Sequence, residues 1–137
     1  MADPDTFVSP TGPAAHAAQH VTSGADPLPL VLCPPVTLTD EATITTNATL
    51  GCHFRVTLGG NRALANPSGL VDGQRITYEI VQDGTGSRTL SYGSQFTFGT
   101  DVPSPTLSTT AGLRDFITAI YNSTTDKLYV VGFARGF

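Results

Sequence analysis

The sequence predicts an all-β protein: an antiparallel β-sandwich or jelly-roll-like domain preceded by an extended N-terminal arm with one short helix. Two observations lead to this fold class. The 137 residues include 14 glycines and 10 prolines, which interrupt the chain too often for long helices. Residues 36–137 alternate short β-branched and aromatic runs with turn signals, a pattern typical of sandwiches and barrels.

The expected arm covers residues 1–35 and contains seven of the prolines. Proline fixes φ and biases the preceding residue toward extended geometry, so we expect an attachment arm rather than a compact unit. Residues 13–20 differ, because they hold four alanines after Pro13, which suits a first helical position. Two helical turns are marginal in water, so this helix is expected only when docked.

About eight strands are expected in the domain at 36–137. The strongest candidate is 74–82, where Ile76, Tyr78 and Ile80 alternate onto one face. The other strands expected individually cover 42–46, 52–58, 89–92, 96–98, 113–121 and 127–134. The last two form a hairpin around a loop at 122–126, and eight strands are typical of a jelly roll.

Both faces of that last hairpin carry apolar side chains. In the strand at 127–134, we expect Leu128, Val130 and Gly132 on one face. Tyr129, Val131 and Phe133 are expected on the other face. One face is expected to meet the core, and the other a neighbouring subunit or sheet. The predicted oligomer interface consists of Phe116, Ile120, Tyr129, Val131 and Phe133.

Composition excludes several function classes. The net charge is -4 with a single lysine, so the chain lacks the basic surface of a nucleic-acid binder. No apolar stretch approaches the 18 or so residues of a membrane span, and no secretory signal is recognised. Only 13% of residues are charged, so the surface can pack on another protein without desolvating many charges.

The two cysteines, Cys33 and Cys52, allow a disulfide or two free thiols. We favour free, partly buried thiols in a protein that is assembled in a reducing cytosol.

Catalytic motifs are missing: the sequence contains no G-x-S-x-G, no H-E-x-x-H and no C-x-x-C, and we expect no enzymatic activity and no cofactor. His16 and His20 stand four residues apart, a spacing that could bind a transition metal with help from Asp26. The favoured alternative is that both histidines hydrogen-bond a partner or pack in a docked helix. Retained function in a His16→Ala, His20→Ala double variant would remove the case for a metal enzyme.

Four aromatic residues could line a sugar-binding groove, although such residues in alternating strands are more often core. They are Tyr78, Tyr92, Phe96 and Phe98.

Two regions carry a family resemblance. The segment H-A-A-Q-H at 16–20, followed by G-A-D-P at 24–27, is similar to a segment near the N-terminal parts of many phage tail-fibre and virion proteins. The region from residue 56 onward resembles a β-domain of phage tail and head appendage proteins. Its phrases are N-P-S-G-L-V-D-G-Q at 66–74, Q-D-G-T-G-S-R-T-L at 82–90 and Y-N-S-T-T-D-K-L-Y at 121–129.

This resemblance implies a structural protein on a bacteriophage virion, assembled in the host cytoplasm and usually trimeric. Heptads and repeats that would build a fibre shaft are lacking, so a capsid decoration or cement protein is favoured. Its partner would be the major capsid protein, bound through an arm surface predicted at His16, His20, Asp26, Pro27, Leu28 and Leu30. The alternative is a tail-fibre or head-fibre component that adheres to a host-surface glycan.

Overall fold

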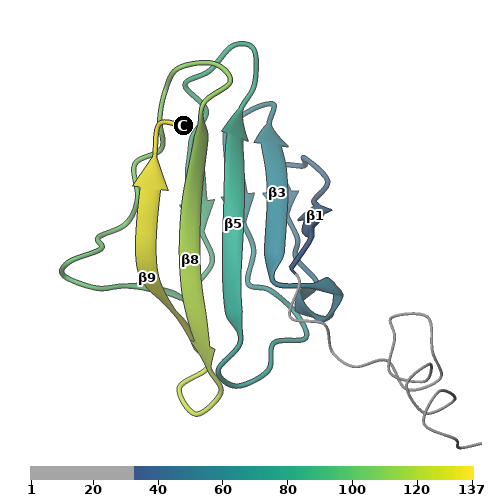
Figure 1. The fold of residues 1–137 in the computed structure, drawn as a ribbon, viewed down its shortest axis with the longest axis vertical. Helices are drawn as coiled ribbons and strands as arrows, with labels where there is room; N and C mark the ends of the chain where they lie inside the picture. Colours follow the sequence, from purple (N-terminus) through teal and green to yellow (C-terminus); the bar gives the residue numbers. More distant parts are fainter. Residues whose placement is uncertain (1–32) are drawn as a thin grey trace, which may run out of the picture. The chain divides into compact units, whose positions relative to one another are not determined.

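The computed structural model describes residues 33–137, which form a β-rich unit with nine strands and one turn of 3-10 helix (Figure 1). The elements are β1 (Pro35–Thr37), β2 (Thr43–Ile44), η2 (Ala48–Leu50), β3 (His53–Leu58), β4 (Arg62–Leu64), β5 (Arg75–Gln82), β6 (Leu90–Tyr92), β7 (Phe96–Phe98), β8 (Arg114–Asn122) and β9 (Lys127–Arg135). The prediction of an all-β domain is confirmed for this part of the chain. No helix within it has the length and apolar character that a membrane crossing requires.

The strands form two sheets whose pairing is mixed. The larger sheet has the order β1-β3-β5-β8-β9-β7, and the smaller has the order β2-β4-β6. Antiparallel pairing joins only β5 to β8 and β8 to β9, whereas every other pair is parallel. The expectation of a purely antiparallel domain is therefore wrong.

Parallel pairing arises because the chain alternates between the sheets as far as β6. Each strand of the larger sheet is followed by a short strand of the smaller one, and the chain then returns one position further along. A parallel pair needs such a crossover, since a tight hairpin joins only antiparallel neighbours. Figure 1 shows β1, β3 and β5 side by side and pointing the same way, with β8 reversed.

One hydrophobic cluster joins the two sheets. Ile76, Tyr78 and Ile80 of β5 are each at most 1% exposed, which confirms the predicted inward face of that strand. They belong to the same cluster as Ile44 and Leu64 of the smaller sheet. Burying a side chain of this size contributes about 1.5–3 kcal/mol, so this cluster is the main source of stability.

A β-bulge in the last hairpin changes which side chains face the core. Thr118 lies opposite Gly132, and the next residue of β8 lies opposite Val130. Val131 therefore has no partner across the strands, and an extra residue shifts the alternation that follows it. The predicted faces hold as far as Val131 and are wrong beyond it, because Phe133 turns inward and packs against the core.

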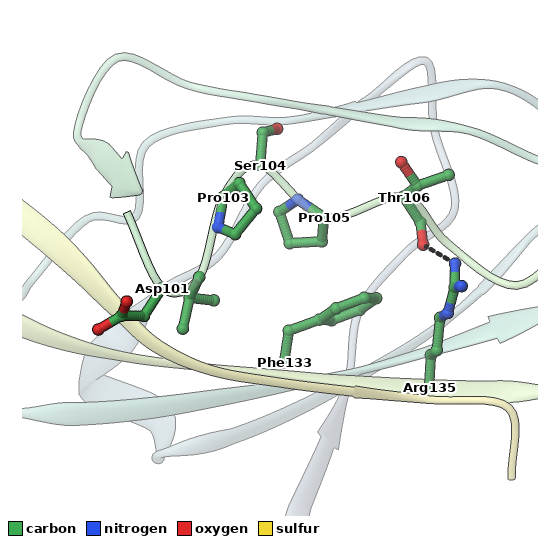
Figure 2. Close-up of a pocket in the computed structure, with 8 residues that line it drawn as sticks. Asp101, Pro103, Ser104, Pro105, Thr106, Phe133 and Arg135 are labelled. Carbon is green, nitrogen blue, oxygen red and sulfur yellow. Dashed lines mark hydrogen bonds between the residues drawn. The ribbon is translucent and has the colours of Figure 1, made fainter. Parts of the chain in front are cut away.

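Phe133 also forms one wall of a small pocket under the loop that follows β7. The pocket has a volume of about 270 Å³ and lies between residues 101–106 and the β9 residues Phe133 and Arg135. Arg135 Nη1 donates a hydrogen bond to the carbonyl of Thr106 at 3.0 Å, which ties the loop to β9. Figure 2 shows Phe133 facing Pro103 and Pro105, with Arg135 at one end of the pocket.

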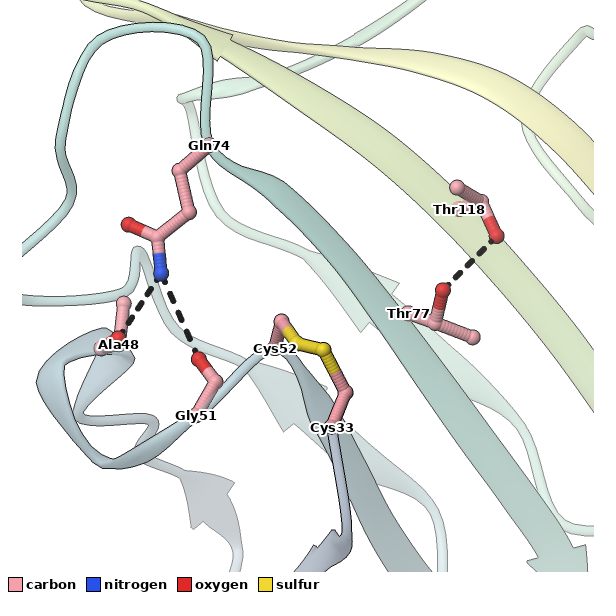
Figure 3. Close-up of a disulfide and its surroundings, with 7 residues drawn as sticks. All are labelled: Cys33, Ala48, Gly51, Cys52, Gln74, Thr77 and Thr118. Atoms are coloured by element: carbon pink, nitrogen blue, oxygen red, sulfur yellow. Dashed lines mark hydrogen bonds between the residues drawn. A yellow bond between two sulfur atoms is a disulfide. The ribbon is translucent and has the colours of Figure 1, made fainter. Parts of the chain in front are cut away.

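A disulfide joins Cys33 to Cys52, with Cα atoms 5.4 Å apart (Figure 3). The prediction of two free thiols is wrong. Strand β1 pairs with β3 so that Pro35 lies opposite His53, and this register brings together the residues that precede the two strands. Pairing between distant segments leaves no periodic pattern in the sequence, so the spacing of the cysteines alone did not predict it.

Candidate interaction face

The larger sheet has one face in the core and one face turned away from it, which we call the outer face. Alternation along each strand assigns the side chains, because neighbours in a strand point to opposite sides. Its central side chains come from β3, β5, β8 and β9: His53, Arg55, Thr57, Arg75, Thr77, Glu79, Val81, Arg114, Phe116, Thr118, Ile120, Tyr129 and Val131.

An apolar patch covers the β8–β9 side of the outer face and consists of Phe116, Ile120, Tyr129 and Val131. Ile120 lies directly opposite Tyr129 across the two strands. Tyr129 is 39% exposed and Val131 is 52% exposed. Phe137 extends the patch, because its ring packs edge-on against Phe116 with centroids 5.7 Å apart. Contiguous exposed apolar side chains of this kind mark interaction sites more often than isolated ones do.

A charged patch lies beside it and is built around one buried carboxylate. It consists of His53, Arg55, Glu79 and Arg114. Glu79 is only 3% exposed although it sits on the outer face. Its Oε2 lies 2.8 Å from Arg55 Nε and 3.2 Å from His53 Nε2, and its Oε1 lies 3.1 Å from Arg114 Nε. The carboxylate is thus paired on both oxygens, as a buried charge must be.

Two other arginines, one in β4 of the smaller sheet and one just before β6, are paired differently, each with its own carboxylate. Arg62 donates through Nε and Nη2 to the two oxygens of Asp40, both at 2.8 Å. Arg88 donates to Asp83 in the same two-nitrogen fashion. These hydrogen bonds lower the pKa of Asp40 and hold the pKa of Asp83 at about 2.

A second buried carboxylate has a purely local role. Asp115 is 1% exposed and accepts hydrogen bonds from the backbone N–H and the hydroxyl of Ser108, at 2.6 and 2.7 Å, and from the N–H of Gly136 at 3.0 Å. It therefore fixes the loop before β8 and the segment after β9. Glu79 differs because its partners are cationic side chains rather than the backbone.

The predicted partner-binding residues lie outside the described part of the chain, so the structure does not test them. They are His16, His20, Asp26, Pro27, Leu28 and Leu30. Of the predicted oligomer interface, Phe116, Ile120, Tyr129 and Val131 share the outer face, whereas the bulge turns Phe133 toward the core.

The aromatic residues considered for a sugar groove lie in or against the core. Tyr78 and Phe96 are buried, at 0% and 7% exposed, and their ring centroids are 6.0 Å apart. Tyr92 packs on Phe96 and on Phe98, with centroids 5.6 and 5.1 Å apart. The alternative that these rings serve packing is confirmed for Tyr78 and Phe96.

The charged patch was not predicted from the sequence. Alternation in β5 puts Glu79 on the face opposite Ile76, Tyr78 and Ile80, but its neighbours depend on register: Arg55 lies opposite Glu79 in β3, and Phe116 lies opposite it in β8. A glutamate in the middle of a strand, away from any turn, was the available signal.

Comparisons of the chain with protein-family models, with curated proteins and with solved structures found no match. Within residues 33–137, no group of three or more His, Cys, Asp or Glu side chains is arranged to hold a metal ion. Function is therefore inferred from the residues and from the geometry of the outer face.

Proposed function

We propose that this is a non-enzymatic structural protein of a bacteriophage virion, a capsid decoration or cement protein with a β-sandwich-type body. In this proposal residues 1–35 attach it to the major capsid protein of the assembled shell. The observation that carries the proposal is the outer face, where an apolar patch adjoins arginines on an ordered sheet. Such a face suits association with other protein subunits better than exposure to water.

The apolar patch is assigned to contacts between copies of the chain, which we propose form a homotrimer. Ile120, Tyr129 and Val131 lie together on it and need no rearrangement to meet a flat surface. A protein that binds only the assembled shell stabilises that shell by linkage. Many copies, each burying on the order of 1,600 Å², suffice for this purpose.

The disulfide supports the proposal that the protein functions outside the host cell. Disulfides persist in oxidising surroundings and are rare where glutathione keeps thiols reduced. A particle assembled in the host cytoplasm and then released meets such surroundings, and the Cys33–Cys52 bond would close there.

The test is to mix the protein with empty shells and with tails of its phage and to image both by electron microscopy. Density at regular positions on the shell is the expected result. A truncated chain that begins at Cys33 keeps the disulfide and every described strand, so it is the matched control for the arm and should leave shells bare. Undecorated shells with the intact chain contradict the proposal, and density on tails favours the second candidate.

The second candidate is adhesion to a host-surface glycan in a tail or head fibre. The pocket beside Phe133 favours it, because its lining combines prolines and an aromatic ring with the charged residues Asp101 and Arg135 (Figure 2). Pockets with an apolar lining and a few polar groups are the usual form of small-ligand sites. Saturable binding to a glycan on an array, lost in the Asp101→Asn variant, supports this candidate. An array on which the protein binds no glycan rules it out.

A further inference from the structure

We propose that the charged patch binds carboxylate groups on an acidic protein surface. The inference rests on the proposed function and names the chemistry of the shell surface that the protein meets. It uses the charged patch of His53, Arg55, Glu79 and Arg114, whereas contacts between copies use the apolar patch beside it.

The first argument is that two guanidiniums share one carboxylate. Arg55 and Arg114 approach opposite oxygens of Glu79, each through Nε, at 2.8 and 3.1 Å. No hydrogen bond joins the terminal nitrogens of either guanidinium to another residue in the range 33–137. Their side chains are 44% and 55% exposed, so both guanidiniums remain accessible to a second carboxylate. A guanidinium presents paired donors that match the two oxygens of a carboxylate.

The second argument is the contrast with arginines elsewhere in the domain. Arg62 and Arg88 each direct two nitrogens at a carboxylate of their own, Asp40 and Asp83. In each of those two pairs, one guanidinium charge is balanced by one carboxylate charge. The charged patch, by contrast, has two guanidiniums for one carboxylate and keeps an unmatched positive charge even with His53 neutral.

The third argument is charge complementarity. The central outer face carries Arg55, Arg75 and Arg114 but only Glu79 as an acid, which gives it a charge of +2 with His53 neutral, in a chain of net charge -4. A positive face on an acidic protein steers that face toward a negative partner and disfavours other orientations.

The fourth argument is that the site is held in place before binding. Arg55, Glu79 and Arg114 come from three neighbouring strands, β3, β5 and β8, in fixed register. Beside them the hydroxyls of Thr77 and Thr118 are hydrogen-bonded at 3.1 Å across β5 and β8 (Figure 3). The buried carboxylate restrains both arginines, and a restrained side chain loses less entropy when it binds.

The experiment titrates the full-length protein with a hexaglutamate peptide and, separately, with inorganic phosphate. Nitrogen-15 NMR follows the Nε–Hε signals of the arginines. We expect saturable shifts of the Arg55 and Arg114 signals with the peptide, and weaker binding as salt is raised. Arg55→Gln and Arg114→Gln should each weaken peptide binding about tenfold, whereas Arg88→Gln, which lies outside the patch and is paired with Asp83, should leave it unchanged. Because both patch arginines are about half exposed, their variants are expected to fold, and amide spectra check this.

An equal loss in Arg88→Gln, or no saturable shift at Arg55 and Arg114, overturns the inference. A response to phosphate without one to the peptide also overturns it, since the ligand would then be a phosphate. Shell decoration separates this inference from the proposed function. If the Arg55→Gln, Arg114→Gln double variant decorates shells as the unaltered protein does, the carboxylate site is wrong and the proposed function stands. If the peptide binds as expected but the unaltered protein leaves shells bare, the carboxylate site stands and the proposed function is wrong.

Discussion

The hydroxyl of Tyr78 donates a hydrogen bond to Thr46 Oγ1 at 3.2 Å, in the buried space between the two sheets. Tyr78 belongs to β5 of the larger sheet, and Thr46 follows β2 of the smaller one. Burial raises the pKa of Tyr78, so the phenol stays protonated and remains a donor at any physiological pH. The bond is therefore a permanent polar link between the two layers.

Removing that donor should destabilise the protein. In Tyr78→Phe the Thr46 hydroxyl stays buried without its partner, and we expect a loss of about 1–2 kcal/mol in the free energy of unfolding, measured by urea denaturation. Tyr92→Phe is the matched control, because the Tyr92 hydroxyl is buried with no hydrogen-bond partner in the described residues. It should be neutral or stabilising. Equal losses in the two variants would show that the Tyr78–Thr46 bond contributes nothing.

The disulfide should account for a large share of stability. Cys33 and Cys52 are 19 residues apart, and closing a loop of that size stabilises by on the order of 3 kcal/mol in the chain-entropy model. Mass spectrometry of the non-reduced protein should find no free thiol, and dithiothreitol should lower the urea midpoint. The Cys33→Ser, Cys52→Ser double variant should match the reduced protein and show no further response to dithiothreitol. An unchanged midpoint on reduction would contradict this prediction.

The bulge at Val131 separates two roles within one strand. Phe133→Ala should cost about 3 kcal/mol of unfolding free energy, because it leaves a cavity at the edge of the core. Val131→Asp should change stability by less than about 1 kcal/mol, since Val131 is 52% exposed, but it should dissociate the proposed trimer. Sedimentation measures the second effect and urea denaturation the first. A chain that sediments as a monomer before any substitution rules out the trimer.

Acid should weaken the protein through Asp83. Arg88 holds the folded-state pKa of Asp83 at about 2, below its value of 3.8 in an unfolded chain. The ionised pair therefore stabilises the fold above pH 3.8, and this contribution is lost as the pH falls through about 2. Asp83→Asn should be less stable than the unaltered protein at pH 6, and the gap should close toward pH 2. Asp101→Asn is the control, and a gap that stays constant with pH would exclude the Asp83–Arg88 pair as its source.

Sequence periodicity predicted what depends on neighbouring residues. The alternation at 74–82 located β5 and its inward face, because a period of two is a local property of the chain. The run at 96–98 likewise matches β7. Strands β4, at Arg62–Leu64, and β1 were missed because neither short run carries the alternate aromatic side chains that marked β7.

The rest depends on pairing between distant segments. Parallel order, the Cys33–Cys52 bond and the grouping of Arg55 with Glu79 all follow from the registers of β1 with β3 and of β3 with β5. The inward turn of Phe133 follows from one unpaired residue in β9, which alternation alone does not reveal. Local patterns constrain which residues form strands, and they do not determine which strand lies beside which.

The position of β7 at the edge of the larger sheet affects the order in which that sheet can be completed during synthesis. Its one neighbour in that sheet is β9, although β8 and two loops separate them along the chain. The strands from β1 to β6 can pair in the order in which they are synthesised, whereas β7 has no partner until Lys127–Arg135 has been translated. A nascent chain therefore leaves β7 without its sheet partner throughout the synthesis of β8, and this edge of the larger sheet is completed only when β9 has been added.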